Sequence, residues 1–448
     1  MELWELSASE ITAKVRDRII SPVEVMEAFL DRINKLEPSL KAWVYLDPDQ
    51  AIAEAKRKET DLNSGKVLGP LYGVPIGVKD IYYTAGIPTT ACSKVFADFI
   101  PEHDATTVST LKEAGAIIIG KTVTTEFACA DPSPTINPWN PHHTPGGSSS
   151  GSAVAVSSRM CPVALGSQTV GSVLRPASYN GLVGFKPNFG RVSRYGVIPV
   201  SWTLDTMGWL VRTVEDAALL LQVLAGPDPN DPVSVKIAVP DYLSCLSKSS
   251  APKFGVLRGF FYDEADEQTR SNLDNILDRF KRSGAQVTEL SLSDSIETAI
   301  FDQRLIMSVE GAAFHEPMFR EHENDYQPQL RAMIENGLRV DAINYSKAKE
   351  RRIKFVRDME ILTEQVDVLI TPSTPTPALA DLSNTGNTIF QGPWTYCGLP
   401  AITIPSGLSS SGLPLGIQMI SPKLAEAKLL RIAWWCEHIL DLNLYPPL

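Results

Sequence analysis

The sequence PGGSSSGSAVAVSSRMCPVALGSQTVGSVLRP occupies residues 145–176 and decides how the rest of the chain is interpreted. It holds two runs of small residues, 146–152 and 169–172, separated by a segment rich in alanine and valine. Runs of glycine and serine also form flexible linkers, but linkers are not usually followed at once by an apolar, structure-forming segment. We therefore predict that both runs are tight turns in a packed core.

Charge and composition restrict the partners of the chain. Its 448 residues carry a formal net charge of −11, and lysine and arginine form no cluster that could follow a phosphate backbone. We therefore expect a small-molecule ligand and no nucleic acid. The six cysteines lack the close pairs of a zinc site or a redox motif, which predicts free thiols in a reducing cytoplasm. No apolar run approaches the roughly 20 residues that cross a bilayer, so no membrane association is expected.

Helices and short apolar strands alternate along the chain, which is typical of an α/β fold. Residues 105–114 have the pattern of a helix, and residues 116–120 have the all-apolar pattern of a buried parallel strand. The second half repeats the order strand, helix, strand at residues 254–257, 267–282 and 286–290. We predict a central mixed, mostly parallel twisted sheet with helices covering both faces.

No linker of the composition that separates domains interrupts this pattern. We therefore predict a single domain over residues 1–448, present as a monomer or a homodimer. The charged, helix-rich stretch at residues 296–362 is predicted to be an insertion into that domain.

Lys79 ends a short apolar segment, residues 71–80, that is predicted to be a buried strand. Lysine is seldom fully buried unless it is paired or takes part in chemistry. A lysine that reaches solvent from the end of the strand fits this segment equally well. If Lys79 is buried, desolvation disfavours its charged form, and the neutral amine can serve as a base near neutral pH.

Ser148 and Ser172 lie in the two runs of small residues and are candidate catalytic serines. Because a serine hydroxyl is a weak nucleophile, it needs a base beside it. The six histidines lie in charged, loop or helical contexts, which disfavours a Ser-His-Asp hydrolase. His142 and His143 are adjacent in a proline-rich loop without a carboxylate or cysteine at ligand spacing, so no metal site and no cofactor are predicted.

The second run, residues 169–172, can also bind an anion. A turn of small residues lets successive backbone N–H groups point to one spot, which is the arrangement of an oxyanion hole. A tight strand-to-helix turn without a ligand and a phosphate-binding loop are the alternatives. The run lacks the Gly-Lys-Ser/Thr ending of a phosphate loop, which makes that alternative the weakest.

Four blocks of the sequence resemble the amidase signature family. They are residues 73–80 (GVPIGVKD), 145–156 (PGGSSSGSAVAV), 166–172 (GSQTVGS) and 184–187 (GFKP). They occur in the family's order, and the resemblance is strongest from about residue 71 to about residue 226. The family includes general amidases and the glutaminase chains of amidotransferases, so the resemblance implies an α/β enzyme that cleaves amides.

The resemblance also implies a Ser-cisSer-Lys triad that works without a cofactor. The family's lysine falls on Lys79, its serine with a cis peptide bond falls on Ser148, and its nucleophile falls on Ser172. Neutral Lys79 is then expected to take a proton from Ser148, which deprotonates Ser172. The implied oxyanion donors are the backbone N–H groups of Thr169, Val170, Gly171 and Ser172.

Two positions depart from the family's pattern. Val170 stands where many members have glycine, which implies a narrower or more apolar turn. Arg175 lies three residues after the nucleophile, where malonamidase-like members use an arginine to meet a substrate carboxylate and other members use it to brace the fold. We favour the bracing role, and Phe127, Ser149 and Arg175 complete the predicted substrate-binding set.

The sequence thus predicts a hydrolase that cleaves the C–N acyl bond of amides, with aryl amides, carbamates or urethanes, and urea derivatives as related substrates. The alternative is the glutaminase subunit of a glutamine-dependent amidotransferase, which requires partner chains. A binding module that keeps the fold without catalysis is disfavoured, because Lys79, Ser148 and Ser172 are all intact.

Overall fold

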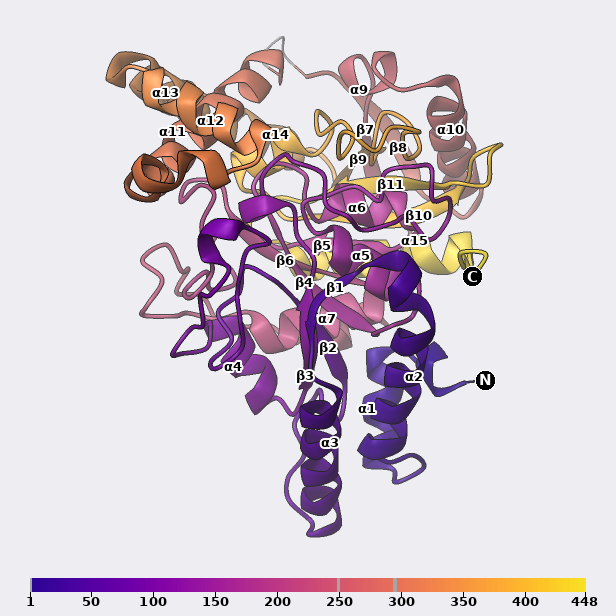
Figure 1. Cartoon of the computed structure of the whole chain (residues 1–448). Coiled ribbons are helices and arrows are strands. Elements are labelled where there is room, and N and C mark those ends of the chain that lie inside the picture. Colours follow the sequence, from indigo (N-terminus) through magenta and orange to yellow (C-terminus); the bar gives the residue numbers. More distant parts are fainter. Residues whose placement is uncertain (1, 248–249, 293–295) are drawn as a thin grey trace.

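One sheet of eleven strands runs through the described residues, 2–247, 250–292 and 296–448, of this computed structural model (Figure 1). In the order in which they pair, the strands are β1 (Trp43–Leu46), β3 (Ile117–Thr122), β2 (Pro75–Lys79), β4 (Val163–Gln168), β6 (Thr206–Val211), β5 (Val183–Lys186), β10 (Ala401–Leu408), β11 (Pro414–Ile420), β9 (Val368–Pro372), β7 (Lys253–Leu257) and β8 (Gln286–Leu290). Because β5 pairs with β10, both halves of the chain share this sheet.

The α/β class and the mixed sheet are confirmed, but the expectation of mostly parallel pairing needs correction. Parallel pairs lie toward the two ends of the sheet, where β2 pairs with β3 and β4, and β7 pairs with β8 and β9, although the edge strand β1 pairs antiparallel with β3. The other six pairs are antiparallel. One cause is β6, which the sequence pattern did not predict and which lies antiparallel between β4 and β5. The hairpin of β10 and β11 is the other cause, because a short connection joins strands that run in opposite directions.

Helices cover both faces of the sheet (Figure 1). On one face lie α5 (Ser150–Ser157) and α6 (Leu174–Tyr179), and on the other lie α7 (Val214–Leu224) and α15 (Glu426–Leu440). The remaining α-helices outside residues 296–363 are α1 (Ala8–Arg16), α2 (Pro22–Leu40), α3 (Pro48–Asn63), α4 (Thr106–Glu113), α8 (Tyr242–Leu246), α9 (Phe260–Asp263), α10 (Glu267–Arg282) and α14 (Gly392–Cys397).

The spacing of Ser7 from Glu10 and of Ser21 from Glu24 in the sequence predicts capping boxes, and both boxes begin the first two α-helices. The N–H of Glu10 donates to Ser7 Oγ at 3.2 Å, and the N–H of Ser7 donates to the Glu10 carboxylate at 2.8 Å. Ser21 and Glu24 repeat this exchange at the start of α2, where Pro22 is the first helical residue. These bonds satisfy N–H groups that the first turn of a helix leaves unpaired.

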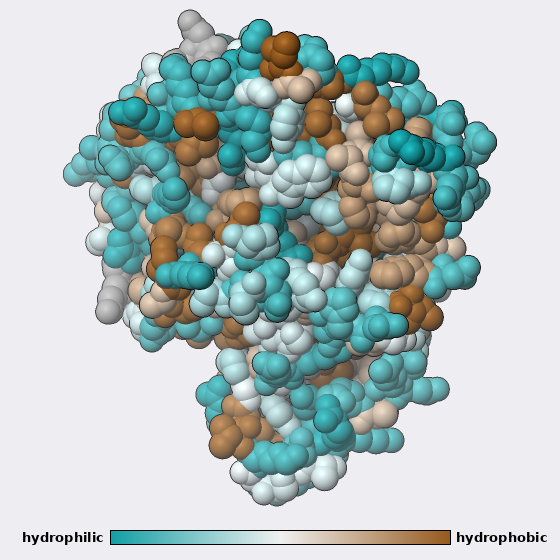
Figure 2. Space-filling view, turned by 90° about the vertical axis from the view of Figure 1, so that its left-hand side faces the viewer, coloured by the Kyte–Doolittle hydropathy of each residue, from teal (hydrophilic) through white to brown (hydrophobic). Residues whose placement is uncertain are grey.

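Three helices, α11 (Ile296–His322), α12 (Pro328–Arg339) and α13 (Ala342–Thr363), fill the stretch predicted to be an insertion and pack on one another beside α14 (Figure 1). On the face of the molecule that includes them, hydrophilic and hydrophobic residues are interspersed (Figure 2). No helix among the described residues combines the length and the apolar character needed to cross a lipid bilayer. All six cysteines, which lie in described parts of the chain, are free.

Candidate active site

Lys79 is the last residue of β2, and the parallel neighbours β3 and β4 flank that strand on both sides. Every residue of β2 is buried, and Lys79 itself is 0% exposed. The buried strand is therefore confirmed, and the structure excludes a lysine that reaches solvent. A central position in the sheet keeps water away from the amine.

Two hydroxyl groups contact the Lys79 amine. Nζ donates to Ser148 Oγ at 2.7 Å and to Ser167 Oγ at 2.9 Å, and no carboxylate in the described part of the chain pairs with it. Burial lowers the pKa of Lys79 from 10.5 to about 7, and the charge of Asp205 opposes this only in part. A large fraction of Lys79 is therefore neutral at neutral pH, the form that can accept a proton.

The turn that carries Ser148 is fixed on both sides. The Gly147–Ser148 peptide bond is cis, as the family resemblance implies. The carbonyl of Gly147 accepts a hydrogen bond from Arg175 Nη2 at 2.7 Å, and the carbonyl of Ser148 accepts one from the N–H of Thr125 at 3.2 Å. Directly after the turn, Gly151 of α5 packs so closely on the chain after β3 that a Cβ atom there would lie 2.4 Å from the nitrogen of Val123. These contacts hold Ser148 Oγ against Lys79.

The turn between β4 and α6 carries Ser172 and is held by Gln168. Oε1 of Gln168 accepts from the N–H groups of Val173 at 2.9 Å and Leu174 at 3.0 Å. Nε2 of Gln168 donates to Thr395 Oγ1 at 2.9 Å, and that hydroxyl donates to the carbonyl of Val170 at 2.8 Å. Gln168, at the end of β4, and Thr395, from α14, thus hold the turn at both ends.

The N–H groups of this turn are left unused by the fold. Within the described ranges, the backbone N–H groups of Thr169, Val170, Gly171 and Ser172 donate to no main-chain or side-chain acceptor. The carbonyls of the turn are engaged instead, since Gln303 Nε2 donates to that of Thr169 at 3.1 Å. The N–H of Ser149 donates to the carbonyl of Ser172 at 3.4 Å, which keeps the two turns side by side. Free N–H groups in a small-residue turn are able to bind a developing oxyanion.

Arg175 is buried and donates to atoms of the protein. Its guanidinium contacts the carbonyl of Gly147, Thr385 Oγ1 at 3.0 Å and the carbonyl of Gly386. Burial lowers the pKa of Arg175 to about 10. These contacts fit the bracing role, because the guanidinium ties the cis turn to a loop from the second half of the chain.

The other two predicted substrate-binding residues have no exposed surface. Phe127 is 0% exposed, and its ring centroid lies 5.0 Å from that of Phe96 and 4.6 Å from that of His315. Ser149 is also 0% exposed, and its Oγ accepts from the N–H of Ser167 at 3.4 Å. Packing encloses both side chains, and their predicted contact with substrate stays a prediction.

Sequence reasoning missed several residues at the site. Ser167 and Gln168 could have been found from the sequence, because they immediately precede the small-residue turn at 169–172, here called the oxyanion turn. Lys121 had a similar signal: it lies at the end of an apolar strand, as Lys79 does, is 0% exposed, and pairs with Asp80 at 3.3 Å. Burial lowers the pKa of Lys121 to about 8. Asp205 had no local signal, since only the folded chain brings it to Thr169.

The chain belongs to the amidase family, because the model of that family, described as Amidase, matches residues 24–430. One chain of the glutamyl-tRNA(Gln) amidotransferase of Geobacter metallireducens, its A component, is 36% identical and is aligned over 97% of both chains. A putative amidase of Mycobacterium bovis is also 36% identical, over 95% of this chain and 92% of its own. The predicted family is thereby confirmed.

Solved structures of amidases share the fold. A peptide amidase from Stenotrophomonas maltophilia matches with a TM-score of 0.87 and 28% identity over 99% of this chain and 98% of its own. A 6-aminohexanoate cyclic dimer hydrolase, solved with its substrate, matches with a TM-score of 0.90 and 26% identity over 100% of this chain and 99% of its own. The chain is therefore an amidase, an enzyme that acts on carbon–nitrogen bonds.

The lowered pKa of Lys79 predicts where activity is lost on the acid side. If neutral Lys79 is the base, kcat/KM rises with pH through about 7 and then levels off, because a lysine with a lowered pKa is protonated only below that value. Hydrolysis rates of an anilide, measured from about pH 5 to about pH 9, give the midpoint. A rate that still rises without a plateau at about pH 9, as expected for a base with the ordinary lysine pKa of about 10.4, contradicts a lowered pKa for Lys79.

Proposed function

We propose that this amidase is a stand-alone serine hydrolase that cleaves the C–N acyl bond of small neutral amides through an acyl-enzyme on Ser172. The observation that carries the proposal is the burial of Lys79 against Ser148 Oγ at 2.7 Å. Aryl amides, carbamates and urea derivatives belong to the proposed substrate range, because attack on their carbonyl carbon also expels nitrogen.

Acylation begins with a proton relay. Neutral Lys79 accepts the proton of Ser148 across their hydrogen bond, and Ser148 accepts that of Ser172. Ser172 Oγ then forms a bond to the carbonyl carbon, and the negative charge on the carbonyl oxygen is stabilised by N–H groups of residues 169–172. Such preorganised donors are typically worth about 3 kcal/mol each in transition-state stabilisation. Within the described residues these N–H groups donate to no protein acceptor, which supports their role as oxyanion donors.

Collapse of the tetrahedral intermediate breaks the C–N bond. The leaving nitrogen takes the proton that returns through Ser148, and an ester of Ser172 remains. Water then attacks the ester with the same relay as base, releases the acid and restores the Ser172 hydroxyl. The overall reaction is amide plus water to carboxylic acid plus amine, or to ammonia when the amide is primary.

The glutaminase subunit of an amidotransferase is the second candidate. The 36% identity to the Geobacter metallireducens amidotransferase chain, over 97% of both chains, favours it. A glutaminase must hold the charged ends of glutamine as well as its amide. Arg175, the cation closest in sequence to Ser172, already donates to the carbonyls of Gly147 and Gly386, which argues against its binding the glutamine carboxylate.

Replacement of the triad residues tests the mechanism. We expect Ser172→Ala to abolish turnover and Lys79→Ala to lower kcat by about 10⁴-fold, because the members of such a triad act as a unit. A fluorophosphonate, identified on the protein by mass spectrometry, should label Ser172. Ser158→Ala, which changes another buried serine at the end of α5, is the control and should be labelled at the wild-type rate. Substantial turnover by Ser172→Ala, or labelling at a different residue, contradicts the assignment.

A substrate panel separates the two candidates. Purified protein is given glutamine, small aliphatic amides, anilides and aryl carbamates, and release of ammonia or amine is measured. We expect kcat/KM for a neutral amide, anilide or carbamate to exceed that for glutamine, because Arg175 is engaged by main-chain carbonyls. Release of ammonia from glutamine alone favours the glutaminase.

A further inference from the structure

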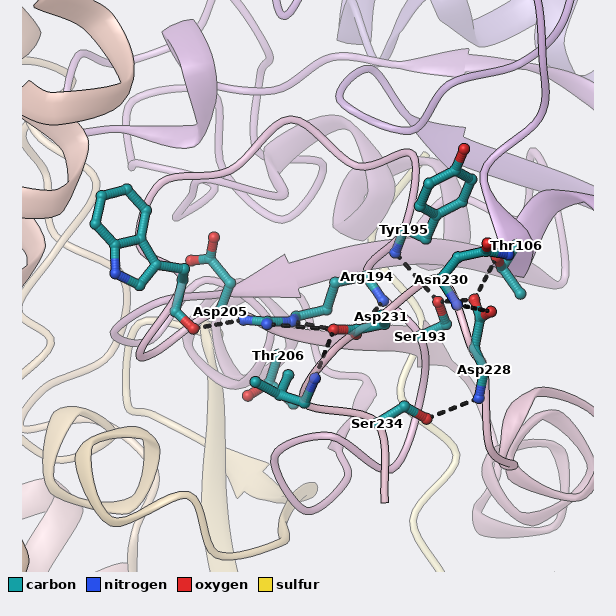
Figure 3. Close-up of polar contacts among 12 residues, drawn as sticks. Thr106, Ser193, Arg194, Tyr195, Asp205, Thr206, Asp228, Asn230, Asp231 and Ser234 are labelled. Carbon is teal, nitrogen blue, oxygen red and sulfur yellow. Dashed lines mark hydrogen bonds and ion pairs between the residues drawn. The ribbon is translucent and has the colours of Figure 1, made fainter. Parts of the chain in front are cut away.

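Asp205 is a buried carboxylate outside the proposed triad. It immediately precedes β6 and is 6% exposed. It lines a cavity together with Arg194 and Asp231, which form an ion pair with each other (Figure 3). Arg194 forms its ion pair with Asp231, whereas the hydrogen bonds of Asp205 are made to other residues.

The hydrogen bonds of Asp205 lead to the oxyanion turn. One carboxylate oxygen, Oδ1, accepts from the hydroxyl of Thr169 at 2.6 Å. The other, Oδ2, accepts from the N–H groups of Val200 at 2.8 Å and Ser201 at 3.0 Å. All three partners are able to donate, and such bonds stabilise the ionised form of a carboxylate. Asp205 therefore links the turn that carries Ser172 to the loop before β6.

The same carboxylate acts on Lys79 through its charge. Asp205 and the thiols of Cys129 and Cys92 all favour the charged form of the Lys79 amine, and Asp205 has the largest effect of the three. Burial raises the pKa of Asp205 above its ordinary value, and its hydrogen bonds and the charge of Arg194 oppose this only in part. Asp205 thus contacts the turn at 169–172 through Thr169, and its charge acts on Lys79.

The loop that contains Asp205 is in turn anchored to α11. The carboxylate of Glu310, which is 0% exposed on its side chain, accepts from the hydroxyl of Ser201 and from the N–H of Thr203 at 2.9 Å. The hydroxyl of Tyr345, from α13, donates to Glu310 at 2.8 Å. Together with the contact of Gln303 on the Thr169 carbonyl, these bonds join the helices at 296–363 to the oxyanion turn.

We propose that Asp205 is a positioning residue for amide hydrolysis: through its hydrogen bond it fixes Thr169, the first residue of the turn at 169–172, and it supplies a negative charge that acts on Lys79. The proposal rests on the proposed function, because it takes Lys79 as the base and residues 169–172 as oxyanion donors. It assigns to Glu310 and Gln303 the support of the same turn from α11.

Two substitutions separate the two effects of Asp205. Asp205→Asn removes the charge of the side chain but keeps its shape. Because Lys79 then loses a group that favours its protonated form, the acid limb of the pH profile, where activity falls with falling pH, should move down by about one pH unit. Thr169→Val removes the hydroxyl but keeps the charge, so the limb should stay in place while the plateau rate falls by about tenfold. The KM should change little in both variants. The readouts are turnover of 4-nitroacetanilide and the rate of fluorophosphonate labelling of Ser172, each followed across pH.

The control is Asp231→Asn, which removes a carboxylate from the same cavity and should leave the acid limb and the plateau unchanged. If the acid limb of Asp205→Asn coincides with that of the wild type, the proposal that the charge of Asp205 acts on Lys79 is overturned. If Asp205→Asn does not fold, as judged by its thermal transition, Thr169→Val decides: a lowered plateau supports the proposal and a wild-type plateau overturns it. Failure of the proposed function is distinct, because the wild-type protein would then not be labelled at Ser172.

Discussion

The removal of Lys79 from water is the constraint on which the rest of the site depends. An amine at the end of an exposed strand stays charged at neutral pH and cannot accept a proton. Here the sheet encloses the amine, and its polar partners among the described residues are the hydroxyls of Ser148 and Ser167. Hydroxyls satisfy the hydrogen-bonding capacity of an amine without adding the negative charge that would hold its proton. The chemistry of the site therefore follows from burial more than from any single contact.

The sheet is what brings the parts of the site together. Lys79 ends β2, the oxyanion turn follows the neighbouring strand β4, and β6, which pairs with β4, begins just after Asp205. The second half of the chain adds the outer contacts, through Thr395 of α14 and Gln303 of α11. Substitutions in α11 or α14 are therefore expected to act on the turn even though these helices lie far from it in sequence.

Sequence alone predicted those parts of the fold that depend on local chemistry. The capping pairs at Ser7 and Ser21, the buried strand before Lys79 and the small-residue turns were all evident, because the signal lay within a few residues. It did not predict β6, where Gly208 interrupts the apolar run. That glycine is explained only by the fold, since a Cβ atom there would lie 2.4 Å from the carbonyl oxygen of Phe185 in the paired strand.

The candidate site divides in the same way. The triad and the oxyanion donors came from the motifs, and their roles stay predictions. The positions of Phe127 and Arg175 could not be derived, because whether a side chain faces a substrate or the core depends on packing between distant segments. Asp205 and Gln303 were missed for the same reason. In the folded chain both contact Thr169, although neither lies in a recognisable motif.

The most direct measurement of the central claim is the ionisation of Lys79 itself. Protein with isotope-labelled lysine is titrated and followed by NMR, and Lys79→Arg identifies the resonance that belongs to this side chain. The account predicts a pKa of about 7 for Lys79, set by its burial. A value near 10.4, the ordinary value for lysine in water, contradicts it.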